Sequence, residues 1–131
     1  MQKRTNTIKT IKFDKGLYKG ELKNDIPNGY GTIYFNKNSK IKSYTGYWRA
    51  GNPYKFGMYV YNNKTFIGHT RNKLAFGVGK VNYKNQDVVV IGKFSKGRAQ
   101  KGIIYYKNLN MKFVGDFNNK GLPKKGFFYQ M

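Results

Sequence analysis

The sequence predicts an all-β fold, an elongated single-layer antiparallel meander of β-hairpins, from three observations. First, a five-residue pattern recurs in which an aromatic or apolar residue, a glycine and a bulky apolar residue occupy alternate positions. Its copies begin at Tyr18, Tyr44, Phe66, Val90 and Phe113, which are 26, 22, 24 and 23 residues apart. Second, this period-two alternation is typical of a half-exposed strand. Third, each copy is followed by a turn rich in Asn, Gly, Pro and Lys, so the chain is expected to be an array of repeated hairpins.

The elements are expected in the following order. A basic N-terminal tail covers residues 1–10, and a half-repeat at 11–17 has the form of the second strand of a preceding hairpin. Each full repeat then forms one hairpin, whose second strand places a glycine and the apolar residues two and four positions later on one face. The full repeats are 18–43, 44–65, 66–89, 90–112 and 113–131. The repeat domain therefore spans residues 11–131, with about five and a half repeats and about eleven strands.

The repeated glycines predict how such a thin sheet protects its backbone. A glycine on the same face as an aromatic residue leaves space for the ring to lie flat across the neighbouring strand. The 12 Tyr and 10 Phe residues are numerous enough to supply these rings. We therefore expect most aromatic residues at repeat positions to belong to the core rather than to a ligand site. For Tyr47 and Tyr54 two interpretations stay open, stacking on nucleic-acid bases and ordinary packing.

The net charge of +21, from 26 basic and only 5 acidic residues, predicts an anionic partner. Codon use in an A/T-rich genome would explain why 22 Lys outnumber 4 Arg, but it would not explain the scarcity of acids. A solvated surface that keeps the protein soluble is the alternative explanation. Lysine suits charge neutralisation without bidentate recognition, so we expect little sequence preference and a steep salt dependence.

The candidate anion-binding residues lie in the turns within the hairpins and on the outward face of the strands. They are Lys19, Lys23, Arg49, Arg71, Lys73, Lys93, Lys96, Arg98 and Lys101. A phosphate backbone or an acidic membrane would both contact such a surface, since each lysine near an anionic membrane contributes about 1 kcal/mol.

Catalysis and metal binding have little support in the sequence. The single histidine, His69, is predicted to face away from the glycine and aromatic positions. Glu21 and Asp116 occupy the same repeat position two repeats before and after it, about 19 Å away at ordinary strand spacing. A general base must lie within about 3 Å of its partner. With no cysteine and five scattered acids, we expect no enzymatic activity, no metal site and no cofactor.

Three repeats share a longer motif. Residues 18–31 read YKGELKNDIPNGYG, residues 44–57 read YTGYWRAGNPYKFG and residues 66–79 read FIGHTRNKLAFGVG. This motif resembles the repeat of the MORN (membrane occupation and recognition nexus) family, roughly Tyr-x-Gly-x-Trp-x-x-Gly-x-x-x-Gly-x-Gly. Lys55 and Lys125 depart from it, because glycine is usual at their positions. With two weaker copies, the resemblance covers nearly the whole chain.

The resemblance implies a sheet of hairpins and roles in scaffolding, self-association, membrane apposition and protein docking, with acidic phospholipids as a proposed ligand. It implies no catalytic residue. MORN proteins are common in protists and in the large DNA viruses that infect them, so a viral structural protein, in a virion or a cytoplasmic assembly, fits the resemblance. The N-terminus has no apolar segment behind its charges, and the longest apolar run, Val88–Ile91, is far shorter than the ~18 residues that cross a bilayer. An intracellular, non-secreted protein is therefore expected.

These observations predict a non-enzymatic structural or docking protein of a larger assembly, whose basic sheet contacts nucleic acid or an acidic protein surface. A peripheral membrane adaptor that binds acidic phospholipids is the first alternative, and an enzyme is the second. Phe127, Phe128 and Tyr129 lie in an apolar final strand, which predicts contact with other protein subunits or self-association through terminal strands. The basic N-terminal tail could cover this strand instead.

Overall fold

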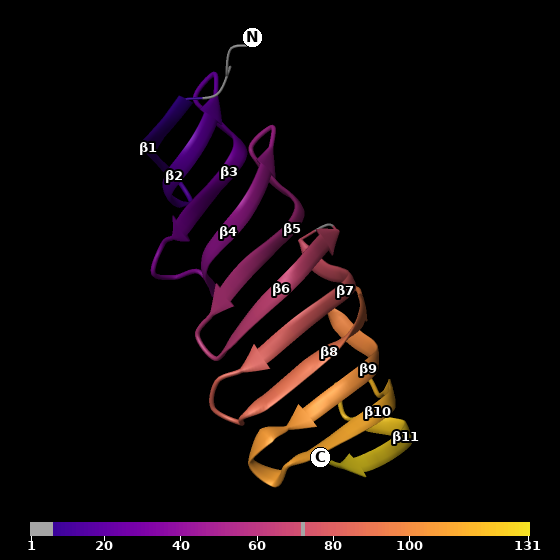
Figure 1. Ribbon diagram of the computed structural model, residues 1–131. Coiled ribbons are helices and arrows are strands. Elements are labelled where there is room, and N and C mark those ends of the chain that lie inside the picture. The colour runs from indigo at the N-terminus through magenta and orange to yellow at the C-terminus, as the bar shows by residue number, and fades with distance from the viewer. Residues whose placement is uncertain (1–6, 72) are drawn as a thin grey trace. The chain divides into compact units, whose positions relative to one another are not determined.

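The computed structural model of the protein describes residues 7–71 and 73–131, and these residues confirm the all-β fold (Figure 1). The strands follow one another in the sheet in chain order, as an antiparallel meander that does not close. They are β1 (Thr7–Phe13), β2 (Gly16–Lys23), β3 (Ile26–Phe35), β4 (Ile41–Arg49), β5 (Asn52–Tyr61), β6 (Lys64–Arg71), β7 (Leu74–Tyr83), β8 (Val88–Ser95), β9 (Arg98–Tyr106), β10 (Met111–Phe117) and β11 (Pro123–Gln130).

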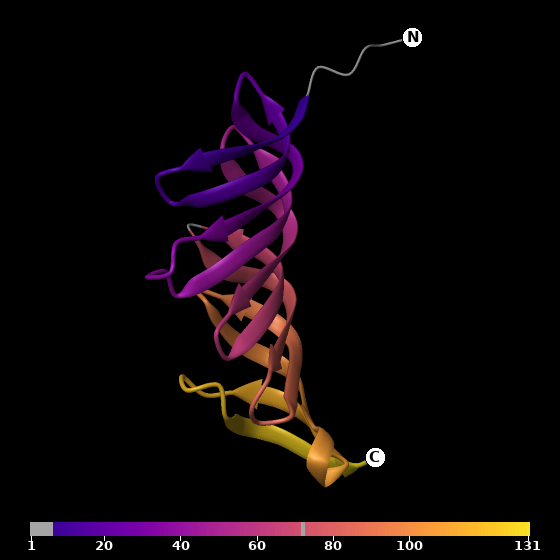
Figure 2. The same cartoon turned by 90° about the vertical axis from the view of Figure 1, so that its left-hand side faces the viewer.

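The chain divides into two compact units at Asn62 and Asn63. The N-terminal unit holds β1 to β5 and the C-terminal unit holds β6 to β11. Each of the five predicted repeats forms one antiparallel hairpin, namely β2–β3, β4–β5, β6–β7, β8–β9 and β10–β11. Within each unit the strands form one twisted layer, which the turned view also shows (Figure 2).

The repeated glycines form a row across each unit, because they are Cα partners on neighbouring strands. In the N-terminal unit the row is Gly20, Gly31, Gly46 and Gly57. In the C-terminal unit it is Gly68, Gly79, Gly92, Gly102, Gly115 and Gly126. The hairpins are thus in the same register relative to the repeat, so every residue that precedes or follows a glycine has an equivalent on the next strand.

Aromatic rings lie directly over this row, as the sequence predicts. A Cβ atom at Gly68 would lie 2.7 Å from Cζ of Phe66, and one at Gly79 would lie 2.7 Å from Cε1 of the same ring. In the N-terminal unit a Cβ atom at Gly57 would lie 2.6 Å from Cζ of Tyr44. Such distances leave no room for any side chain, so the absence of a Cβ atom is what lets each ring cover the hydrogen-bonded backbone.

The polar atoms of the core aromatics in the N-terminal unit are hydrogen-bonded to the backbone. The Tyr18 hydroxyl donates to the Glu21 carbonyl oxygen at 2.6 Å, and the Tyr44 hydroxyl donates to the Tyr47 carbonyl oxygen at 2.8 Å. Trp48 Nε1 donates to the Gly31 carbonyl oxygen at 3.0 Å. Each ring therefore contributes apolar burial without leaving a buried donor unpaired.

The core of the C-terminal unit uses the same face with a different set of side chains. Phe66 and Phe94 contact edge to face, with ring centroids 5.2 Å apart, and Phe113 lies 5.0 Å from Phe128. The fourth repeat has Val90 at the ring position, and that side chain is buried too. The face is therefore apolar throughout the unit, although only some of its glycines lie under a ring.

The predicted tail over residues 1–10 is wrong for residues 7–10. β1 begins at Thr7 and continues to Phe13, and Thr7 is the Cα partner of Leu22 on β2. Thr7, Ile8 and Thr10 are β-branched residues that suit a strand, and pairing with β2 satisfies their backbone groups despite the intervening lysine. Residues 1–6 of the predicted tail lie outside the described residues. A 3₁₀ turn at Lys107–Leu109 also occupies a connector where no helix is predicted.

We predict that Gly68→Val lowers the free energy of unfolding by about 2 kcal/mol, because the added side chain must displace the Phe66 ring. Thermal unfolding followed by circular dichroism measures this loss. Gly121→Asn is the control, because Gly121 has φ 79°, nothing lies within 4 Å of its Cβ position, and asparagine tolerates left-handed backbone. Equal melting temperatures for the Gly68→Val variant and the parent protein would contradict the role of the glycine row.

We predict that Tyr18 makes folding sensitive to alkaline pH. Burial, with a smaller contribution from the Glu21 carboxylate, raises the pKa of Tyr18 to about 12 from its ordinary value of about 10. The raised pKa means that the folded state favours the neutral phenol, so the stabilisation is complete below pH 10 and is lost as the pH rises to about 12. The stability of the parent protein should therefore fall relative to Tyr18→Phe across this window in denaturant titrations. Parallel curves would show that the phenol ionises as readily in the folded protein.

Candidate anion-binding surface

All nine predicted anion-binding residues have exposed side chains. Three belong to the N-terminal unit, where Lys19 and Lys23 lie on β2 and Arg49 ends β4. Six belong to the C-terminal unit and lie on β6, β8 and β9 or in the turns beside them. They are Arg71, Lys73, Lys93, Lys96, Arg98 and Lys101. The structure therefore places each of them where a large anionic partner can reach it.

The acids are too few to neutralise this surface. Five acidic residues can pair one to one with at most five of the 26 basic residues, which leaves a net charge of +21. Lys9 Nζ lies 2.9 Å from Asp25 Oδ1, and both side chains are more than half exposed. Such exposed pairs contribute at most about 1 kcal/mol. Most of the positive charge must therefore be balanced by solvent ions or by a partner.

Two of the predicted residues face each other on the outward side of the C-terminal unit. Lys93 on β8 and Lys101 on β9 are Cα partners, and both side chains are exposed. The same row continues to Asp116 on β10 and Lys125 on β11. Like charges directly opposite each other destabilise a sheet. Asp116 offsets part of this repulsion at Lys101, whereas the other Cα partner of Lys93 is the uncharged Val78. A bound anion near Lys93 would reduce the repulsion further.

Hairpin tips are tied together by backbone hydrogen bonds within each unit. The Gly97 N–H, in the tip of β8–β9, donates to the Ala75 carbonyl oxygen near the tip of β6–β7 at 3.0 Å. In the N-terminal unit the Gly51 N–H donates to the Pro27 carbonyl oxygen in the same way at 2.9 Å. Cations from successive turns therefore gather along one edge of each unit, which separates them from the cations in the connectors at the other ends of the strands.

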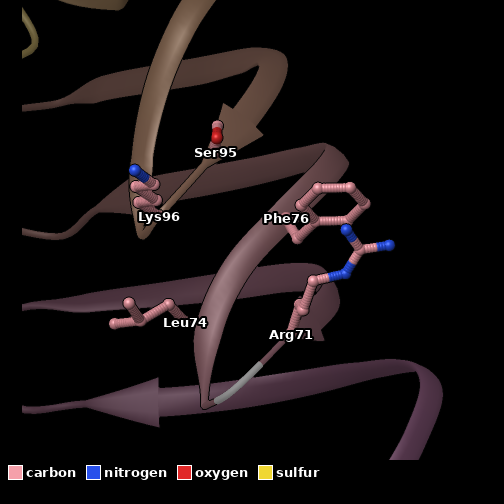
Figure 3. Close-up of a pocket in the computed structure, with 5 residues that line it drawn as sticks. All are labelled: Arg71, Leu74, Phe76, Ser95 and Lys96. Atoms are coloured by element: carbon pink, nitrogen blue, oxygen red, sulfur yellow. The ribbon is translucent and has the colours of Figure 1, made fainter.

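A hollow of about 200 Å³ lies between two of these tips in the C-terminal unit. It is lined by Arg71, Leu74, Phe76, Ser95 and Lys96. Figure 3 shows the guanidinium group of Arg71 beside the ring of Phe76, whereas Lys96 and Ser95 come from the other hairpin. Arg71 Cζ lies only 3.8 Å from the centroid of that ring, which is a close cation–π contact. The hollow thus combines an apolar floor with two cations and a hydroxyl group.

A similar stacked pair occurs one repeat earlier in the N-terminal unit. Arg49 Cζ lies 5.1 Å from the ring centroid of Tyr54, and Arg49 Nη1 donates to the Tyr54 hydroxyl at 3.3 Å. Tyr30 and Tyr47 are Cα partners nearby, and their exposed rings meet edge to face with centroids 5.5 Å apart. Tyr47 and Tyr54 are both exposed to solvent, so neither ring is part of the buried core.

Arg71 and Lys96 both line the hollow, but Figure 3 shows their side chains on opposite sides of β7. Lys93 and Lys101 lie opposite each other on the outward face. Leu74, Phe76 and Ser95 are the members of the hollow that the sequence alone did not indicate. The sequence does contain a pattern that would have predicted the arginine–ring contacts. An arginine precedes an aromatic residue by five positions in both Arg49–Tyr54 and Arg71–Phe76. These two pairs begin 22 residues apart, like the repeats that contain them.

The other predicted site residues have the following positions. His69 lies on β6 with an exposed side chain, four strands from Asp116 in the sheet order. Among residues 7–71 and 73–131, no three His, Asp or Glu side chains gather into a metal-binding group. Phe127, Phe128 and Tyr129 on β11 are 70%, 56% and 47% exposed. Three consecutive large side chains of this strand are therefore open to solvent.

The sequence matches no protein-family model and no curated protein. In the part of the chain that the structure describes, no helix is long and apolar enough to cross a membrane.

We predict that Lys93→Glu has opposite effects on folding and on binding. The new carboxylate would face Lys101, so the free energy of unfolding should rise by about 0.5 kcal/mol, whereas retention on immobilised heparin should weaken. Lys80→Glu is the matched control, because Lys80 on β7 has the apolar Cα partners Ile67 and Ile91. It should weaken retention without the gain in stability. A loss of stability in Lys93→Glu would show that the two lysines do not repel each other.

Proposed function

We propose that this protein is a non-enzymatic structural or docking component of a larger assembly. Its strongly basic sheet holds an anionic partner, nucleic acid or an acidic protein surface, without sequence specificity. One observation carries the proposal: the nine predicted cations are exposed on a regular sheet, and two of them face each other as Cα partners. A surface of that kind gains stability when negative charge approaches it.

We also propose that the chain belongs to the MORN repeat family. Five hairpins with glycine pairs in register, four of which have an aromatic ring lying over a glycine, support this assignment. The repeat uses its aromatic face for stability, so the variable residues of the outward face and the hairpin tips remain for binding. A scaffold of this kind suits contact with an extended partner rather than enclosure of a small substrate.

A peripheral membrane adaptor for acidic phospholipids is the second candidate, and exposed apolar residues at the hairpin tips favour it. Ile26 and Leu74, each 48% exposed, begin the second strands of their hairpins close to Lys23 and Lys73. Apolar side chains beside lysines suit the interface of an anionic bilayer. The charged residues of the outward face, however, lie along the strands and not at the hairpin tips. A flat membrane that contacts the tips would therefore not reach them. Nucleic acid and acidic protein surfaces therefore rank first.

The exposed residues of β11 provide a place for other subunits in this assembly. Phe127, Phe128 and Tyr129 are open to solvent, while Phe128 also contacts Phe113 in the core. A partner strand or a second copy of the chain would cover these rings and add apolar burial of about 25 cal/mol per Å². Self-association through this strand would place several basic sheets on one polymer and increase avidity.

We predict that the combined change of Lys96, Arg98 and Lys101 to Glu weakens anion binding at low salt and leaves folding intact, because these side chains are exposed. Gel shifts with random-sequence DNA and RNA, and flotation with neutral and acidic vesicles, measure the binding. The control converts Lys84 and Lys107, in the connectors, and Lys112, near the start of β10, to Glu, which makes the same charge change at the other ends of the strands of the same unit. Equal losses in both variants would indicate a response to net charge alone. Binding to acidic vesicles but to neither nucleic acid would favour the membrane adaptor.

A further inference from the structure

Arginine occurs in this chain almost only at hairpin tips. The sequence holds 22 Lys and 4 Arg, and Arg4 lies outside the described residues. Of the others, Arg49 ends β4, Arg71 ends β6 and Arg98 begins β9. Lysine would supply the same charge at these places. Arginine adds a planar group that stacks on rings and donates two parallel hydrogen bonds to a phosphate.

We propose that the Arg71–Phe76 pair and the hollow beside it bind single-stranded nucleic acid, with a phosphate on the edge of the Arg71 guanidinium and a base stacked on its exposed face. This inference rests on the proposed function and narrows its partner to one class. The Arg49–Tyr54 pair of the N-terminal unit is a second site of the same kind. The two sites are independent, since each is complete within its own unit.

The contacts within the hollow support this ligand. The Phe76 ring holds the Arg71 guanidinium at 3.8 Å, so this long side chain loses less freedom when it binds. The Ser95 hydroxyl and Lys96 come from the neighbouring tip, which the hydrogen bond from Gly97 N–H to Ala75 holds in place. Arg71, Ser95 and Lys96 can each donate a hydrogen bond to a phosphate oxygen of the strand, and Leu74 offers an apolar surface to a sugar or a base.

A single strand fits this site better than the other anionic partners. Bases in a duplex are stacked on each other and cannot reach a guanidinium plane, whereas those of a single strand can. A lipid headgroup or an acidic side chain supplies charge but no aromatic plane. A surface that acts by charge alone would favour duplex DNA, because its charge density is higher than that of a single strand. Preference for the single strand is therefore diagnostic of stacking.

Fluorescence anisotropy with labelled single-stranded and duplex oligonucleotides of equal phosphate number tests the inference. The parent protein should bind the single strand more tightly, on the order of tenfold. Arg71→Lys together with Arg49→Lys should remove this preference, while the slope of log affinity against log salt stays unchanged because no charge is lost. Lys84→Ala is the control, since Lys84 lies in the connector after β7 and not at a hairpin tip. Loss of its charge should lower the salt slope but leave the preference intact.

Phe76→Leu provides an independent variant that keeps apolar bulk and removes the aromatic plane. Its melting temperature is measured alongside, so that weaker binding by a folded variant can be assigned to the site. Equal affinity of the parent protein for single strand and duplex would overturn the inference but not the proposed function. The inference would also be overturned if Arg71→Lys weakened binding to phosphatidylserine vesicles as much as binding to the single strand. In that case the arginine would recognise phosphate alone. Failure of the parent protein to bind heparin or any nucleic acid would reject the proposed function itself.

Discussion

The contact between an aromatic ring and a row of glycines is the constraint on which the rest of this structure depends. A sheet with no second layer must protect its hydrogen-bonded backbone from water, and only a residue without Cβ lets a ring lie directly on it. Tyr18, Tyr44, Phe66 and Phe113 lie over glycines in this way. One face of each unit is thereby committed to stability. The outward face and the hairpin tips are left to differ between repeats, and the candidate sites lie there.

The high positive charge is compatible with this fold because the charges lie away from the ring-covered face. Exposed lysines keep most of their hydration, and salt screens their repulsion beyond about 10 Å at 0.1 M. The pair of Lys93 and Lys101 is different, since strand geometry fixes the two residues opposite each other. Their repulsion is built into the register, and Asp116, the Cα partner of Lys101 on β10, offsets part of it. The candidate surface is therefore slightly destabilising in the free protein, which is a common property of functional sites.

The sequence predicted the hairpins, the aromatic face and the exposure of the nine cations because local patterns specify each of them. Alternation defines the strand faces, and turn residues define the tips. The start of β1 at Thr7 escaped prediction, because pairing with β2 rather than local pattern decides it. The hollow escaped as well. The register shifts after Gly68, so that Phe76 rather than Val78 is the Cα partner of His69. No local sequence pattern within this repeat predicts which ring contacts Arg71.

Register shifts of this kind link the repeat to its candidate function. They follow the glycine pair in each of the five hairpins, for instance after Gly20, Gly46 and Gly68. A bulge increases the local twist and changes the direction of the side chains beside it. In β4–β5 and β6–β7 the strand after the turn carries Tyr54 or Phe76, and an arginine stacks on that ring. At the equivalent place β2–β3 carries Asn28. The same register shift thus occurs in every hairpin. The residue that lies at the shift determines which hairpin tips carry an arginine stacked on an aromatic ring.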